Sequence, residues 1–146
     1  MSKFAAFAMV ALTVVGCNAR PSEPQPTQKV PAVEQHLAEL TVPAVAAALK
    51  DKKIVAVDAN GAETREKYGV VPGAVLLTDH RTYALTELPA DKASALVFYC
   101  GGTQCRASDA AATRAAAAGY ASVSVMRDGI RGWVGAGQPT TSAPKS

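Results

Sequence analysis

Two cysteines and an arginine stand close together in the segment Cys100-Gly101-Gly102-Thr103-Gln104-Cys105-Arg106. An apolar run with β-branched and aromatic residues precedes this segment and predicts a buried strand over residues 96–99. An alanine-rich run follows it and predicts a helix over residues 106–118, which Gly119 ends. A glycine loop between a strand and a helix N-terminus presents backbone N–H groups to an anion. The helix dipole and Arg106 both favour a thiolate, so we expect a lowered pKa for the Cys100 thiol.

The elements needed to position this loop alternate along the chain. Helices are predicted over residues 42–49, 63–68 and 129–134, the first with Thr41 as its N-cap and Pro43 in its first turn. Short strands are predicted over residues 54–57, 75–77 and 123–126, and residues 79–93 read as a loop. Short apolar strands separated by helices predict an α/β fold, with a central parallel sheet covered by helices on both faces. Sites in such sheets lie at the carboxyl ends of strands, where Cys100 falls.

Size and composition narrow the classes of function. The chain has 146 residues, of which 49% are hydrophobic and 18% charged, so it can bury the core of one domain. Its formal net charge is +3, and its lysines and arginines are scattered along the chain rather than clustered. Because there is neither a basic stripe nor a set of stacking aromatics, no nucleic acid partner is predicted. Three cysteines are too few for a disulfide scaffold, and no ligand spacing predicts a metal site or a cofactor.

The first residues predict export and a lipid anchor. Lys3 precedes an apolar run over residues 4–16 that is too short to span a membrane and reads as a signal peptide. The run ends in Val14-Val15-Gly16-Cys17, which resembles a bacterial lipobox, so Cys17 is the predicted lipidation site. An ordinary signal peptide with an incidental cysteine is the alternative. Asn18 weakly favours the outer over the inner membrane, on the periplasmic side.

If Cys17 carries the lipid, a Cys17→Ser chain should lose labelling by a fatty-acid probe in cells. A Cys17→Ser chain that is labelled like the wild type would contradict the predicted lipid anchor.

Domain boundaries follow from these signals. A proline-rich segment over residues 17–36 cannot bury a core and reads as a tether between the membrane and the domain. The folded domain is predicted over residues 37–140. Residues 135–146 read as a frayed tail, of which 141–146 are predicted to be disordered.

Several motifs, in order, resemble those of a single-domain rhodanese. They are Val57-Asp58, Arg65-Glu66-Lys67-Tyr68 with Val71-Pro72-Gly73-Ala74, Val97-Phe98-Tyr99-Cys100, Gly119-Tyr120, Gly129-Ile130-Arg131-Gly132-Trp133 and Ala136-Gly137-Gln138-Pro139. The resemblance implies a rhodanese-like domain with Cys100 as the catalytic cysteine. It implies a sulfurtransferase that takes sulfane sulfur from a small anion such as thiosulfate and passes it to a thiophilic acceptor. No protein partner is identified.

The chain also departs from the family's pattern. Asn60 stands near the position of the family's arginine after the aspartate, and Val70 replaces its histidine. Five residues separate Cys100 from Arg106, one more than in the common family loop. That spacing resembles the rhodanese-fold phosphatases and arsenate reductases, whose loops hold a tetrahedral oxyanion. Phosphatase or arsenate reductase activity is therefore the alternative, although phosphoprotein substrates are scarce outside the cytoplasm.

Each candidate residue has a functional and a structural interpretation. In the functional interpretation, Cys100 carries a persulfide, and the backbone N–H groups of the loop bind its outer sulfur. In the structural interpretation, Cys100 is a buried cysteine of the core. Arg106 binds a sulfonate or phosphate edge, or it is a solvated first-turn residue. Cys105 resolves a persulfide or sulfenate, forms a disulfide with Cys100, or is a small buried residue. Asp58 supports the loop by a hydrogen bond or ends its strand. A third, non-catalytic hypothesis makes Cys100 and Cys105 a redox switch or a Cu(I) site.

Overall fold

The computed structural model describes residues 37–143. The predicted signal peptide, the predicted lipidation site Cys17 and the predicted tether lie outside the described residues, as do residues 144–146 of the predicted tail. Within the described range, no helix has the length and apolar character needed to cross a membrane.

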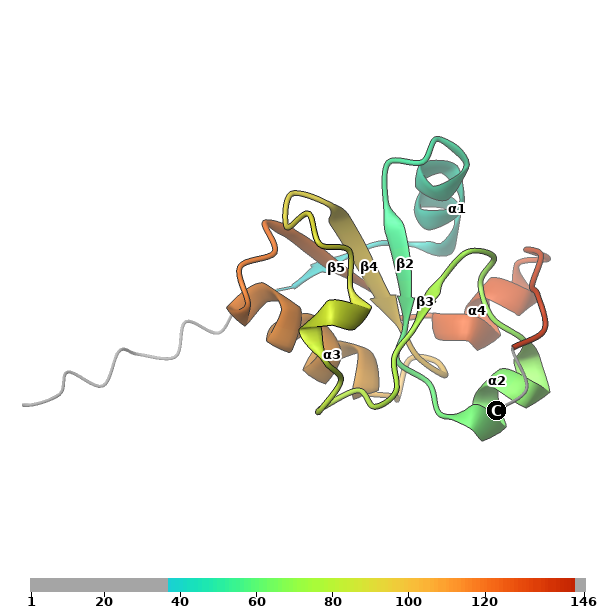
Figure 1. Cartoon of the computed structure of the whole chain (residues 1–146). Helices are drawn as coiled ribbons and strands as arrows, with labels where there is room; N and C mark the ends of the chain where they lie inside the picture. Colours follow the sequence, from blue (N-terminus) through green and yellow to red (C-terminus); the bar gives the residue numbers. More distant parts are fainter. Residues whose placement is uncertain (1–36, 144–146) are drawn as a thin grey trace, which may run out of the picture. The chain divides into compact units, whose positions relative to one another are not determined.

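Five parallel strands form a sheet in the order β1-β5-β4-β2-β3. They are β1 (Ala38–Glu39), β2 (Val55–Asp58), β3 (Val75–Leu76), β4 (Ala95–Tyr99) and β5 (Ser122–Met126). β4 occupies the centre of the sheet (Figure 1). Its residue Tyr99 pairs with Asp58 on one side and with Met126 on the other. Since all five strands run the same way, their carboxyl ends meet at one edge, where the chain leaves β4 at Cys100.

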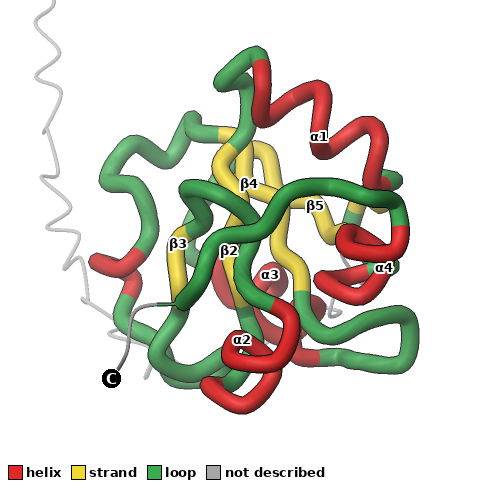
Figure 2. Tube along the Cα trace, turned by 90° about the vertical axis from the view of Figure 1, so that its right-hand side faces the viewer, coloured by secondary structure: helices red, strands yellow, loops and turns green. Residues whose placement is uncertain are grey.

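Helices cover both faces of this sheet, as predicted. They are α1 (Val42–Lys50), α2 (Ala62–Tyr68), α3 (Ala107–Ala117) and α4 (Gly129–Gly135). α3 lies on one side of the sheet, and α1 and α4 lie on the other (Figure 2). One core cluster contains side chains of α3, and a second contains side chains of α1 and α4. α2 packs beside α4. The segment between β3 and β4, predicted to be a loop, contains the short 3₁₀ helix Leu85–Glu87.

Side chains along β4 point alternately to the two faces of the sheet, and this alternation determines on which face the Cys100 thiol lies. Leu96 and Phe98 belong to the core cluster on the α3 side, while Val97 and Tyr99 belong to the cluster on the α1 and α4 side. Cys100 continues the alternation and joins the α3 side. The strand period of two therefore directs the thiol towards the beginning of α3.

The prediction that the tail is frayed from Gly135 onward is wrong for the residues that the structure describes, because they form specific hydrogen bonds. The N–H of Gln138 donates to the carbonyl of Trp133, and the Trp133 Nε1–H donates to the carbonyl of Pro139 over 2.8 Å. Thr141 then pairs with Val70 in an antiparallel bridge. The hydrogen-bond partners of this segment lie in α4 and in the chain after α2. No local sequence pattern in the tail could therefore predict these contacts.

Candidate active site

The segment between β4 and α3 is a tight loop with free backbone donors. The N–H of Cys105 donates to the carbonyl of Gly102 over 2.9 Å, which turns the chain back on itself. Within residues 37–143, the N–H groups of Gly101, Gly102, Thr103 and Gln104 have no hydrogen-bond acceptor. Successive free N–H groups beside a helix N-terminus are the arrangement that binds anions in proteins. The predicted anion-binding loop is therefore present in the backbone geometry.

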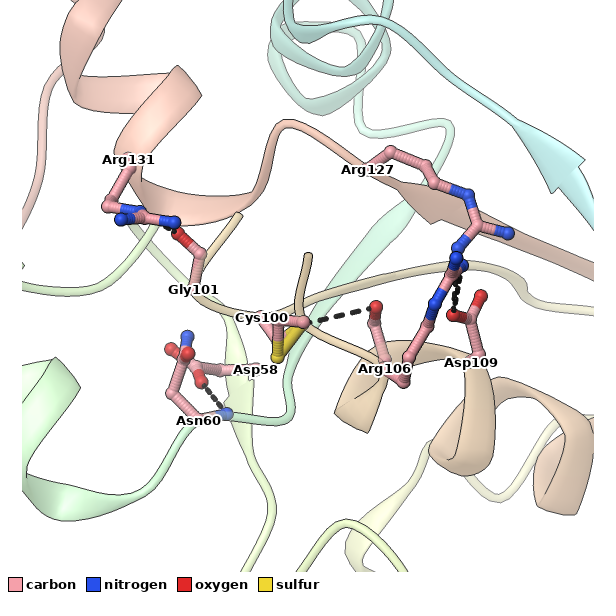
Figure 3. The surroundings of a disulfide bond; sticks show 10 residues. Asp58, Asn60, Cys100, Gly101, Arg106, Asp109, Arg127 and Arg131 are labelled. Atoms are coloured by element: carbon pink, nitrogen blue, oxygen red, sulfur yellow. Dashed lines mark hydrogen bonds and ion pairs between the residues drawn. A yellow bond between two sulfur atoms is a disulfide. The ribbon is translucent and has the colours of Figure 1, made fainter. Parts of the chain in front are cut away.

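Cys100 lies at the base of this loop, with only 2% of its surface exposed. Its Sγ is 3.4 Å from the Oγ of Ser108, a buried residue in the first turn of α3. Its Sγ is also bonded to the Sγ of Cys105, and the two Cα atoms are 6.3 Å apart (Figure 3). The structure therefore shows the oxidised form of the pair. In the reduced form, the Ser108 hydroxyl is placed to donate to a Cys100 thiolate.

Helix α4 holds the loop from its other side. The N–H of Ile130 donates to the carbonyl of Cys100 over 2.8 Å, and the N–H of Arg131 donates to that of Gly101 over 3.4 Å. Gly129 makes this approach possible, because its φ is +59° and a Cβ there would lie 2.3 Å from the Cys100 carbonyl oxygen. The carbonyls of Cys100 and Gly101 thus accept hydrogen bonds from α4, and the loop N–H groups are left available to a ligand.

Arg131 places a positive charge against the loop. Its Nε donates to the Gly101 carbonyl over 3.0 Å, and its side chain is exposed (Figure 3). A Cβ on Gly102 would meet the Arg131 Nη2 at 2.9 Å, so the guanidinium lies directly on the backbone of that glycine. A cation fixed beside free N–H groups adds to the attraction of this loop for an anion.

Arg106, the predicted anion ligand, is directed elsewhere. Its Nη1 lies 3.3 Å from the Asp109 Oδ2, and 72% of its side chain is exposed. The same carboxylate oxygen binds Arg127 (Figure 3). The guanidinium of Arg127 also pairs with Glu39. Hydrogen bonds to these two carboxylates raise the pKa of Arg127. Arg106 therefore belongs to a charged network on the surface beside α3.

Asp58 supports the region without contacting the thiol. Its carboxylate is fully buried on the face of the sheet opposite Cys100, where it accepts hydrogen bonds from the Tyr99 hydroxyl at 2.7 Å and the Asn60 N–H at 2.6 Å. The Arg65 Nε of α2 lies 3.4 Å from it. Burial, and then the Asp58 carboxylate, raise the pKa of Tyr99, so its hydroxyl keeps the proton that it donates. The Asp58 carboxylate thus connects β2 to β4 through Tyr99 and to α2 through Arg65.

Asn60 connects this buried support to the loop. It is 8% exposed, and its Oδ1 would lie 3.8 Å from a Cβ on Gly101. Its Nδ2 is buried and has no hydrogen-bond partner among residues 37–143. The residue that stands near the position of the family's arginine therefore brings a free amide group beside the loop.

The predicted site residues divide into two groups. The fold brings Cys100 together with Gly101, Gly102, Thr103, Gln104 and Cys105, but it directs Arg106 and the Asp58 carboxylate away from the thiol. Sequence reasoning missed Ser108, Arg131 and Asn60. Ser108 had a signal, because it begins the buried stripe of α3 that continues through Ala111, Ala112 and Ala115. Arg131 stands in one of the motifs that carry the family resemblance, but it lies 30 residues from its partner, and no local pattern places it at the loop.

A family comparison agrees with this architecture. The family model described as Rhodanese-like domain matches residues 41–136, which include the strand, the loop and α4. A comparison with curated proteins found no match.

Solved structures share the fold at low sequence identity. A Bacillus halodurans protein is 22% identical with a TM-score of 0.61, covering 72% of this chain and 77% of that one. A Rhodopseudomonas palustris protein of unknown function, described as a possible tyrosine phosphatase, is 25% identical with a TM-score of 0.57, and the match covers 72% of this chain and 85% of that one. The thiosulfate sulfurtransferase of Pseudomonas aeruginosa is 24% identical with a TM-score of 0.60, covering 75% of this chain but 21% of that one.

Proposed function

This chain belongs to the rhodanese-like domain family, and we propose that it is a sulfurtransferase that carries sulfane sulfur as a persulfide on Cys100. One observation carries the proposal: the Cys100 Sγ lies at the carboxyl end of the central strand, beside a loop of free N–H groups and 3.4 Å from the Ser108 hydroxyl. A persulfide places one negative charge on its outer sulfur, and such a loop stabilises one such charge.

The proposed reaction has two steps. The Cys100 thiolate attacks the sulfane sulfur of thiosulfate, a Cys100 Sγ–S bond forms, and the S–S bond of thiosulfate breaks with its electron pair leaving on sulfite. A thiophilic acceptor such as cyanide then attacks the outer sulfur, which leaves as thiocyanate and returns the thiolate. No general base is needed, because a thiolate already carries the electron pair that attacks.

The charges around the loop support a sulfur anion over a tetrahedral oxyanion. A transferred phosphoryl group spreads charge over several oxygens and needs a guanidinium that faces the thiol. Arg106 pairs with Asp109 on the surface instead. The longer loop and the likeness to a possible tyrosine phosphatase keep phosphatase or arsenate reductase activity as the competing proposal.

We expect Arg106→Ala to keep most of the thiosulfate:cyanide activity, because its guanidinium pairs with Asp109 rather than with the loop. Arg131→Ala should weaken the use of thiosulfate about tenfold through a higher KM, since it removes the cation that lies on Gly102. Steady-state kinetics on both variants check this, with an aryl phosphate as second substrate. Wild-type turnover of the phosphate that collapses in Arg106→Ala would establish the competing activity.

We also propose that the domain works on the periplasmic side of the cell envelope, tethered through a lipid on Cys17. The lipobox-like end of the signal segment is the support. The proposed donor is then a small anion that diffuses to the domain, and the proposed acceptor is a thiol. A chain that fractionates with soluble periplasmic proteins would contradict the anchor.

A further inference from the structure

The loop contains a second sulfur, the Sγ of Cys105, beside the Sγ of Cys100, which is the proposed nucleophile. The Sγ atoms of Cys100 and Cys105 are bonded, with Cα atoms 6.3 Å apart, inside the range of about 4.4–6.8 Å that disulfides span. The turn closed by the Cys105 N–H and the Gly102 carbonyl brings Cys105 back to Cys100. The native loop therefore places Cys105 in direct reach of the Cys100 Sγ.

The two sulfurs differ in exposure. Cys100 is buried, whereas Cys105 is half-buried and follows the exposed residues Thr103 and Gln104. An external dithiol therefore meets the Cys105 side of the disulfide first. In the oxidised form, Cys100 has no thiolate with which to attack a sulfur donor, so the disulfide must be reduced before the chain can take up sulfur.

From this geometry we propose that Cys105 is a resolving cysteine that releases the bound sulfur as hydrosulfide. The Cys105 thiol gives its proton to the outer sulfur of the Cys100 persulfide, and the Cys105 Sγ attacks the Cys100 Sγ. The Cys100–Cys105 disulfide forms, and the outer sulfur leaves as HS⁻ with that proton and the electron pair of the broken bond. The persulfide sulfur is reduced and the two cysteines are oxidised. A dithiol reductant then opens the disulfide by thiol–disulfide exchange and supplies two electrons and two protons. The proposal rests on the proposed persulfide function.

The site of attack distinguishes this role from a relay of sulfur along the chain. Attack on the outer sulfur would move the persulfide to Cys105 and free Cys100. Attack on the inner sulfur yields the bond between the two Sγ atoms that the structure contains. With a dithiol present, the net reaction takes thiosulfate and the dithiol to sulfite, hydrosulfide and the cyclic disulfide.

The test is a single turnover without oxygen. Wild type, Cys105→Ser, Cys105→Ala and the matched control Ala117→Ser, on the exposed end of α3, are reduced, freed of reductant and mixed with thiosulfate. Hydrosulfide and the intact mass of the chain are followed in time. Wild type and Ala117→Ser should release hydrosulfide in amounts equal to the protein and finish as the disulfide. The Cys105 variants should keep one added sulfur and release hydrosulfide at least about a hundredfold more slowly, because they lack the intramolecular thiol.

Each other outcome overturns a definite claim. Wild type that retains its added sulfur and releases no more hydrosulfide than Cys105→Ser would overturn the resolving role while leaving the persulfide function intact. Cys105 variants that fold but take up no sulfur would overturn the persulfide function, and the resolving role with it.

Discussion

Cys100→Ser is expected to lower the rate of thiosulfate:cyanide sulfur transfer by about a thousandfold or more, to the rate without enzyme. A serine hydroxyl remains protonated near neutral pH and is a poor nucleophile towards sulfur, so no persulfide forms. Initial rates of thiocyanate formation, on protein reduced beforehand, measure the effect.

The matched control for this variant is Cys105→Ser. Both substitutions remove the disulfide in the same way, so a loss of stability from the missing bond affects both. Cys105→Ser should retain thiocyanate formation, because cyanide takes the outer sulfur directly from Cys100. Equal losses of activity in the two variants would remove the reason for assigning the nucleophile to Cys100.

Gly129→Ala is expected to destabilise the domain by about 3 kcal/mol or more and to abolish activity. Its φ of +59° is in the left-handed region, and its new Cβ would lie 2.3 Å from the Cys100 carbonyl oxygen and 2.6 Å from the Gly102 nitrogen. These are backbone atoms of the loop, which cannot move without changing the position of the thiol. Urea unfolding of the reduced chain measures the loss.

Gly135→Ala serves as the control, since Gly135 ends the same helix and a Cβ there meets nothing within 4 Å. It should leave both the unfolding midpoint and the activity close to those of the wild type. A Gly129→Ala chain as stable and active as Gly135→Ala would show that α4 does not fix the loop.

Much of this architecture could be predicted from the sequence because its signals are local. The apolar runs mark β2, β4 and β5, and Thr41 with Pro43 marks the beginning of α1. β1 was not predicted, because its two residues, Ala38 and Glu39, do not form an apolar run. β3 is equally short, but Val75 and Leu76 are both apolar, and it was predicted. The thiol at the end of β4 follows from the strand and the glycines after it.

The parts that could not be predicted depend on contacts between distant segments. The orientation of Arg106 is decided by Asp109 and by Arg127, which lies beyond β5. Arg131 comes to the loop only because α4 begins against it. The sequence identified Asp58 as a supporting residue, but only the pleat of β2 shows that its carboxylate faces Tyr99 rather than the thiol.

The central claim is that Cys100 carries sulfane sulfur, and the intact mass of the Cys105→Ser chain after incubation with thiosulfate tests it most directly. This variant cannot resolve a persulfide internally, so the bound sulfur is retained. We predict the addition of one sulfur atom, located on the peptide that contains Cys100, lost on treatment with cyanide and absent from a Cys100→Ser chain. An unchanged mass in the folded and reduced Cys105→Ser chain would contradict the account.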